Sequence, residues 1–160
     1  KIISLCKKTN STIVLLGGNN DAEKGEKISS VCANAINLCG KLSLHQSAHV
    51  VKYAALVISH DTGMMHIAAA YKKKIVSLWG NTIPEFGMYA YYGKSLDKEE
   101  LLAAKKGENN NLFISEVSEL TCRPCSKIGF KACPKQHFNC MNKQNEEKII
   151  GFIEKVLLTQ

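Results

Sequence analysis

With 160 residues, the chain is long enough for one domain with a buried core. Its 45% hydrophobic and 22% charged residues are ordinary for a globular protein, and no apolar run approaches the ~20 residues that a membrane-spanning helix needs. The net charge of +7 is uneven, because residues 121–143 contain Arg123 and four lysines and no acid. This segment predicts either a solvated basic surface or a surface that faces phosphate or an anionic membrane.

Apolar runs alternate with helical patterns along most of the chain. Residues 1–8 have the pattern of the end of an amphipathic helix, and this abrupt start predicts a fragment of a longer protein. Buried strands are expected over residues 12–16, 36–40, 55–59, 74–80 and 111–115. Helices are expected over residues 21–35, 44–53 with Ser43 as cap, 62–71, 97–105 and 146–158, the last within a C-terminal segment 144–160. The alternation predicts an α/β fold with a parallel sheet, helices on both faces and right-handed crossovers, in a single domain over 1–160.

The segment that follows the strand at 55–59 is the most informative one. Asp61 or Thr62 is suited to cap the next helix, and Gly63 lets a ligand approach the backbone. The unpaired N–H groups there and the helix dipole form an anion site, and Thr62 and His66 share one helix face because they are four residues apart. This arrangement suits a sugar-nucleotide diphosphate. The alternative is that the same residues serve only capping and turn chemistry.

Two further loops are expected near this segment. In parallel sheets, ligands bind outside the carboxyl ends of the strands. Gly17 and Gly18 follow the first strand, residues 60–63 follow the third, and residues 80–82 follow the fourth. We therefore expect three loops to converge on one rim. The aromatic residues of 86–93 suit either stacking on a base or sugar, or packing under a long loop, which is the more frequent role.

Seven cysteines divide into two groups. Cys6, Cys32 and Cys39 lie in apolar settings and are predicted to be small buried hydrophobes. Together with the odd total, this argues against a secreted disulfide framework and favours a reducing compartment.

The other four cysteines form the pattern C-x2-C-x7-C-x6-C within residues 121–143. Four thiols suit a tetrahedral structural zinc site, although the downstream spacing is not that of a standard zinc finger and His137 is a spare ligand. Three interpretations of these cysteines stay open: a structural metal site, disulfides, or unligated thiols. We favour a structural staple of some kind. A redox role is disfavoured, because the C-x-x-C pair does not open a helix after a strand. The tentative metal ligands are Cys122, Cys125, Cys133 and Cys140.

Residues 61–70, followed by 74–80, resemble the heptosyltransferases of glycosyltransferase family 9. These enzymes build the inner core of bacterial lipopolysaccharide from ADP-heptose. The resemblance extends through residues 14–18 and 37–44 and the cysteine pattern, so it covers nearly the whole chain.

The resemblance implies a GT-B architecture, in which two Rossmann-like domains flank the active site, and this chain resembles the C-terminal, donor-binding half. By resemblance, Asp61 holds hydroxyls of the donor sugar, Thr62 and Gly63 meet the diphosphate, and His66 lies against the pyrophosphate or sugar. An acidic residue soon after the pair Gly17–Gly18 contacts the ribose in relatives. Two residues compete for that place here, Asp21 and Glu23.

The family's catalytic base and acceptor site lie in the N-terminal domain, so the resemblance implies no catalytic residue here and an inactive fragment. It implies inverting transfer from an ADP-sugar to the lipopolysaccharide core, with no cofactor required for the chemistry. The helix that begins at Thr62 would stabilise charge on the departing ADP. The expected location is cytoplasmic, at most peripheral to the inner membrane.

Two other classes of function compete with this one. A nucleotide-binding or regulatory module without transferase activity is the main alternative. A basic, zinc-stapled nucleic-acid-binding domain is disfavoured, because the basic residues are not interleaved with aromatic ones along a groove, and no nucleic-acid partner is expected.

Overall fold

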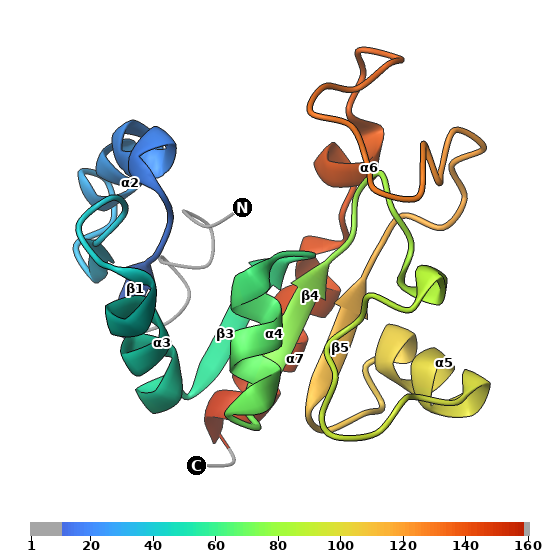
Figure 1. Ribbon diagram of the computed structural model, residues 1–160, viewed down its shortest axis with the longest axis horizontal. Helices are drawn as coiled ribbons and strands as arrows, with labels where there is room; N and C mark the ends of the chain where they lie inside the picture. The colour runs from blue at the N-terminus through green and yellow to red at the C-terminus, as the bar shows by residue number, and fades with distance from the viewer. Residues whose placement is uncertain (1–10, 159–160) are drawn as a thin grey trace. The chain divides into compact units, whose positions relative to one another are not determined.

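The computed structural model describes residues 11–158 and divides the chain into two compact units, residues 1–50 and 51–160 (Figure 1). Each unit is described by itself. The helix expected over 1–8 and Cys6 lie outside the described residues. The single donor-binding domain over 1–160 stays a prediction.

The first unit is a small β-α-β arrangement. Strand β1 (Ile13–Leu15) is followed by the 3-10 turn η1 (Asn19–Asp21) and helix α2 (Ala22–Ser29), which leads to β2 (Ala35–Asn37). The two strands are parallel, with Ile13 opposite Ala35. Ile13 and Ile28 pack against the buried Cys32 and Ala35, and Cys39 is also buried. Cys32 and Cys39 are therefore small buried hydrophobes, as predicted.

Helix α3 (Leu44–Tyr53) spans the border between the two units. It begins after Ser43, as the sequence predicts. The Ser43 hydroxyl accepts a hydrogen bond from the Gln46 N–H, and the Gln46 side chain accepts one from the Ser43 N–H. This reciprocal pair satisfies two N–H groups at the helix start.

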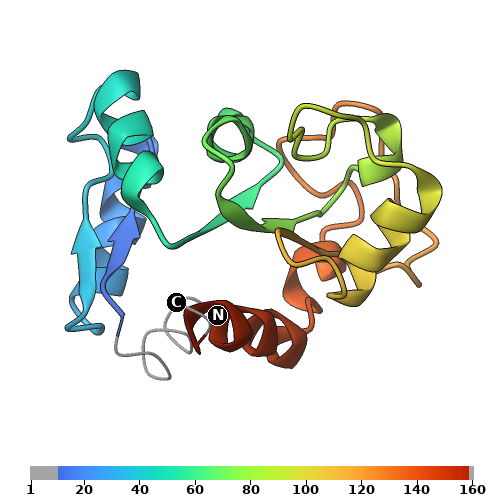
Figure 2. The ribbon, with the colours of Figure 1, turned by 90° about the horizontal axis from the view of Figure 1, so that it is seen from below.

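The second unit contains a parallel sheet in the order β3-β4-β5. These strands are β3 (Leu56–His60), β4 (Lys74–Leu78) and β5 (Leu112–Ser115), and the remaining elements are α4 (Gly63–Ala70), the 3-10 turn η2 (Pro84–Phe86), α5 (Lys98–Lys106), α6 (Asn139–Asn142) and α7 (Glu146–Leu158). Helices α4 and α7 cover opposite faces of this sheet (Figure 2). A strand with a helix on each face must be apolar on both sides. Central strand β4 meets this requirement, since Ile75 and Val76 are completely buried.

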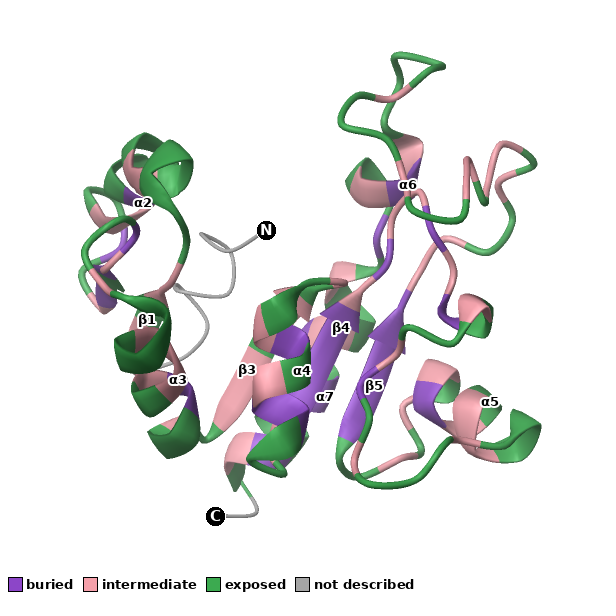
Figure 3. Ribbon diagram, in the orientation of Figure 1, coloured by how far each residue is buried: buried purple, intermediate pink, exposed green. Residues whose placement is uncertain are grey.

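The core of the second unit fills the two layers beside the sheet. On one side, Met65 and Ala68 of α4 are completely buried. On the other, Phe152 of α7 stacks on Phe113 of β5 with ring centroids 5.4 Å apart. Buried residues therefore follow β4, β5 and the inner helix faces, whereas the long loops around α6 are mostly exposed or half-buried (Figure 3).

The α/β fold with parallel strands is confirmed, with two differences from the expected elements. The strands form two sheets instead of one, because β1 and β2 are only three residues long and pair with each other. Helix α2 ends at Ser29, not near residue 35, since the hydroxyls of Ser29 and Ser30 bond back to the carbonyls of Glu26 and Lys27. Placement of the chain as a C-terminal half stays a prediction.

Candidate functional site

The connection from β3 to α4 carries the segment that the sequence singles out. Thr62 is the extended N-cap residue of α4, but its side chain makes no capping hydrogen bond. Its hydroxyl instead lies 3.0 Å from the Ser59 hydroxyl. A Cβ added at Gly63 would meet nothing within 4 Å. The prediction that the Thr62 side chain caps α4 is therefore wrong. The backbone at Gly63 borders open space, as the approach of a ligand requires.

Asp61 is held by groups from two other elements. The hydroxyl of Thr82, which follows β4, and the imidazole of His66 on α4 both lie close enough to favour its ionised carboxylate. Burial raises the pKa of Asp61, and His66 and Thr82 offset part of that rise. The second unit thus brings together Asp61, His66 and Thr82 at the carboxyl ends of two neighbouring strands. A carboxylate in this setting is suited to accept hydrogen bonds from ligand hydroxyls.

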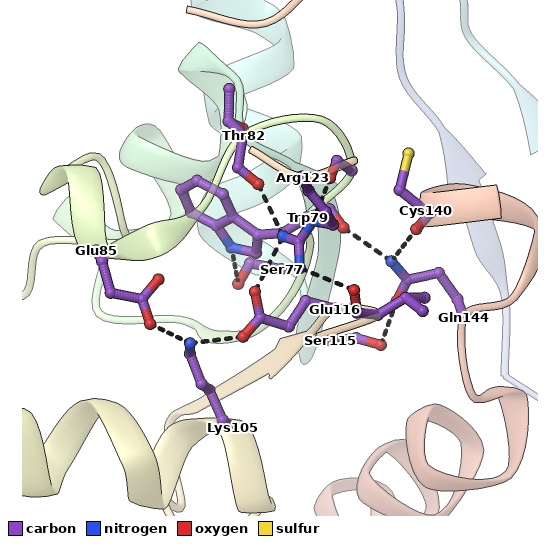
Figure 4. Close-up of polar contacts among 12 residues, drawn as sticks. Ser77, Trp79, Thr82, Glu85, Lys105, Ser115, Glu116, Arg123, Cys140 and Gln144 are labelled. Carbon is purple, nitrogen blue, oxygen red and sulfur yellow. Dashed lines mark hydrogen bonds and ion pairs between the residues drawn. The ribbon is translucent and has the colours of Figure 1, made fainter. Parts of the chain in front are cut away.

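The loop that carries Thr82 is tied to a distant part of the chain. Four consecutive carbonyl oxygens, those of residues 79–82, each accept a hydrogen bond from the segment 123–144. Gln144 Nε2 donates to the Trp79 carbonyl at 2.9 Å (Figure 4). Arg123 donates from Nε to the Gly80 carbonyl at 2.6 Å and from Nη2 to the Thr82 carbonyl at 2.8 Å (Figure 4). The backbone N–H of Cys125 donates to the Asn81 carbonyl at 2.8 Å. The C-terminal segment therefore fixes the position of this loop.

Arg123 is itself held by a buried ion network. Its side chain is 3% exposed and pairs with Glu116, whose side chain is 9% exposed, at 3.0 Å. Lys105 of α5 pairs with the other oxygen of Glu116 and with Glu85 of η2 (Figure 4). Arg123 Nη1 also donates to the carbonyl of Val117 at 3.1 Å. Arg123 therefore contributes nothing to an exposed basic surface, in contrast to the prediction for 121–143.

The other predicted site residues lie in the first unit. Asp21 folds back on its own turn, where its Oδ2 accepts the Gly18 N–H at 3.0 Å, and a Cβ added at Gly17 would lie 2.8 Å from the same side chain. Glu23 instead forms an exposed pair with Lys27 on α2 at 2.6 Å. The structure thus brings Gly17, Gly18 and Asp21 together. Convergence of this turn with the loops of the second unit stays a prediction.

Comparison with known proteins identifies the family. The model of glycosyltransferase family 9 (heptosyltransferase) matches residues 1–111. The chain belongs to glycosyltransferase family 9. Lipooligosaccharide heptosyltransferase 2 of Campylobacter jejuni is 28% identical over 120 residues, covering 75% of this chain and 31% of that protein. The protein of the same name in Haemophilus influenzae is 30% identical over 117 residues, covering 68% and 34%.

Solved structures show the same fold. A family 9 glycosyltransferase from Veillonella parvula matches with a TM-score of 0.67 and 20% identity, covering 99% of this chain and 41% of that one. The ADP-heptose lipopolysaccharide heptosyltransferase II of Escherichia coli matches with a TM-score of 0.65 and 17% identity, covering 99% and 40%. The chain spans about a third of the length of the curated relatives that it matches.

In this family 9 chain, the four late cysteines and His137 line one pocket of about 340 Å³. Cys122 Sγ lies 3.8 Å from His137 Nε2. Backbone N–H groups, that of Phe138 foremost, lower the pKa of Cys133, whereas burial, followed by the charges of Cys122 and Cys133, raises that of Cys125. The four late cysteines therefore border one pocket.

The arrangement of these cysteines is not that of a ligand set. The six cysteines within the described part of the chain are free thiols, so the disulfide interpretation is not supported. Among residues 11–158, no three histidine, cysteine or acidic side chains are arranged to hold a metal ion. The zinc interpretation stays a prediction.

The family 9 chain also shows what sequence patterns miss. Thr82, Arg123 and Gln144 carry no motif of their own, and Arg123 is indistinguishable by spacing from the exposed lysines around it. In the aromatic segment, Tyr89 donates to the Leu96 carbonyl and Tyr92 to the Lys73 carbonyl, so these rings hold the loop in place. No helix over residues 11–158 has the length and apolar character to span a membrane.

Proposed function

We propose that this chain is the donor-binding, C-terminal part of an inverting glycosyltransferase that transfers heptose, or a related sugar, from ADP-heptose to the lipopolysaccharide inner core. The observation that carries the proposal is the cluster of Asp61, His66 and Thr82 beside the start of α4. Family membership supports the reaction class. The curated relatives are named lipooligosaccharide or lipopolysaccharide heptosyltransferases, which supports the sugar and the acceptor.

Each group has a role in this proposal. Asp61 accepts hydrogen bonds from hydroxyls of the donor sugar. The backbone N–H groups near Thr62 and Gly63, with the dipole of α4, bind the diphosphate, and His66 lies against the diphosphate or the sugar. The turn of Gly17 and Gly18, with Asp21 or Glu23, contacts the ribose.

Two parts of the full-length enzyme act in the transfer, a base outside this chain and the start of α4. A base outside this chain deprotonates the acceptor hydroxyl, which attacks the anomeric carbon while the bond to ADP breaks. The positive end of α4 stabilises the negative charge that develops on the departing ADP. This chain alone therefore binds the donor without turnover. We place the enzyme in the cytoplasm, at most peripheral to the inner membrane.

The test measures binding and turnover separately in the full-length protein. Calorimetric titration with ADP, UDP and RNA should show ADP binding, weaker UDP binding and no RNA binding. Incubation with ADP-heptose and heptose-deficient lipopolysaccharide should release ADP. ADP binding without turnover would support the nucleotide-binding or regulatory module instead, and tight RNA binding would overturn both.

We also propose that the four late cysteines are a structural staple that closes around one zinc ion. The observation that favours it is the pocket shared by Cys122, Cys125, Cys133 and Cys140. Cysteine thiolates are preferred ligands of structural zinc, and binding of the ion would draw the four side chains of this pocket closer together than they lie in the structure. The staple has no part in the transfer chemistry.

A further inference from the structure

Residues 79–82 form a loop whose position depends on a segment more than forty residues away along the chain. Arg123 donates to the Gly80 carbonyl at 2.6 Å and to the Thr82 carbonyl at 2.8 Å. We propose that Arg123 is a positioning residue of the donor site, which fixes this loop so that the Thr82 hydroxyl meets the carboxylate of Asp61. The proposal rests on the proposed role of Asp61 in donor binding.

The chemistry of the Arg123 side chain suits this task. A guanidinium carries five N–H donors in a planar fork and stays charged at every accessible pH. Here three of its nitrogens donate to four acceptors, the carbonyls of Gly80, Val117 and Thr82 and the Glu116 carboxylate. Because the side chain is 3% exposed, water does not compete for these bonds. Loss of the fork would leave loop carbonyls without their donor, and they would turn toward water.

Thr82 transmits this constraint to the site. Its backbone carbonyl accepts a hydrogen bond from Arg123 at 2.8 Å, and its side-chain hydroxyl favours the ionised carboxylate of Asp61. Thr82 is 6% exposed, so it has little room to rearrange while it keeps both contacts. A displaced loop therefore changes the surroundings of the Asp61 carboxylate directly. The 121–143 segment acts on the site through a buried arginine and not through its exposed lysines.

Glu116 offers a matched control, because it holds Arg123 without touching the loop. Its two oxygens are shared between Arg123 and Lys105. Glu116→Gln removes the buried charge but keeps an oxygen that accepts from the Arg123 guanidinium. This variant is expected to lose stability while Arg123 still holds the carbonyls of Gly80 and Thr82.

The experiment compares Arg123→Gln, Arg123→Lys and Glu116→Gln in the full-length enzyme. We expect Arg123→Gln to raise KM for the ADP-sugar about tenfold, the effect of losing one hydrogen bond to a charged group. Arg123→Lys keeps a point charge without the fork, so its KM should rise less. Glu116→Gln should lower Tm and leave KM within about twofold of the parent.

A second readout separates positioning from stability. If Arg123 sets the Thr82 contact, Arg123→Gln also moves the acid limb of the donor kcat/KM profile to higher pH, which a loss of stability alone does not do. If Arg123→Gln does not fold, the double variant Arg123→Gln with Glu116→Gln takes its place, because it leaves no unpaired charge buried between positions 116 and 123.

The proposal is wrong if the rise in KM is proportional to the loss of Tm in the Arg123 and the Glu116 variants alike. It is also wrong if Arg123→Gln leaves both KM and the pH profile unchanged. An Asp61→Asn variant measured in parallel identifies the other failure. If Asp61→Asn leaves KM and kcat unchanged, the proposed function of the site is wrong, whatever Arg123 does.

Discussion

The hydroxyl of Thr82 lies beside the carboxylate of Asp61 and favours its ionised form, although the two residues follow different strands of the sheet. Asp61 comes after β3 and Thr82 after β4, and these strands are parallel neighbours. Their carboxyl ends therefore lie at the same edge. The hydroxyl supports the carboxylate's charge in a partly buried position, where burial alone would raise the pKa of Asp61 further.

Asp61→Asn in the full-length enzyme should lower kcat/KM for the donor by about 10- to 100-fold, because hydrogen bonds to a charged group are worth ~1.5–3 kcal/mol. Its Tm should change little, since Thr62 and not Asp61 is the N-cap residue of α4. Turnover and thermal unfolding are measured on the same preparation.

Ser43→Ala is the control for this variant. Ser43 is a capping residue of α3, so its loss should cost about 1 kcal/mol of stability with no effect on donor kinetics. If Asp61→Asn loses activity only in proportion to stability, as a cap would, then Asp61 has no role in donor binding.

Thr82→Val should move the acid limb of the donor kcat/KM profile to higher pH. The Thr82 hydroxyl stabilises the ionised carboxylate, so its removal leaves burial to raise the pKa of Asp61 further. Donor binding that needs the charged form is then lost at a higher pH as the solution is acidified. Thr12→Val, an exposed threonine of the first unit, should leave the profile unchanged. A shift to lower pH would contradict the assignment.

Two glycines in helices should respond to alanine with opposite signs. In α2, a Cβ at Gly25 would lie 2.2 Å from the side-chain oxygen of Asn37, which is buried and donates to the Ala22 carbonyl. Gly25→Ala should therefore destabilise the protein by about 2 kcal/mol, as overpacking does. In α7, a Cβ at Gly151 would meet nothing within 4 Å.

Gly151→Ala is thus the matched control, and it should stabilise the protein by up to about 1 kcal/mol through helix propensity. Urea unfolding of both variants gives the comparison. Equal effects of the same sign would mean that the contact between α2 and Asn37 does not constrain the first unit.

Protein purified under reducing conditions should contain about one zinc ion per chain, and a chelator should lower its Tm, because metal binding contributes to the stability of the folded state. Cys125→Ser should abolish the metal. Cys32→Ala, at a buried cysteine outside the pocket, should leave the metal content unchanged. If the protein contains no metal and its Tm does not change in chelator, the four late cysteines are packing residues.

The sequence by itself determined the elements and the local part of the site. The apolar run over 74–80 predicts a buried strand, and β4 occupies Lys74–Leu78. Ser43 predicts the start of α3, and residues 60–63 predict the turn from β3 into α4. These features depend on side-chain periodicity, capping and turn chemistry within a few residues, so a linear pattern contains them.

Only the tertiary structure decided what holds the site. Arg123 and Thr82 are 41 residues apart, and Gln144 reaches Trp79 across 65 residues. In the sequence, Arg123 looks like one more charge in a basic segment, and Thr82 is one residue of the loop 80–82 expected at the rim, with no motif that marks its contacts. Their roles follow from packing of the 123–144 segment against the end of β4. This packing buries the guanidinium, which bonds two of the four carbonyls of residues 79–82, while Gln144 and the Cys125 N–H bond the other two. Such contacts depend on the position of every element between the partners, and no local spacing records them.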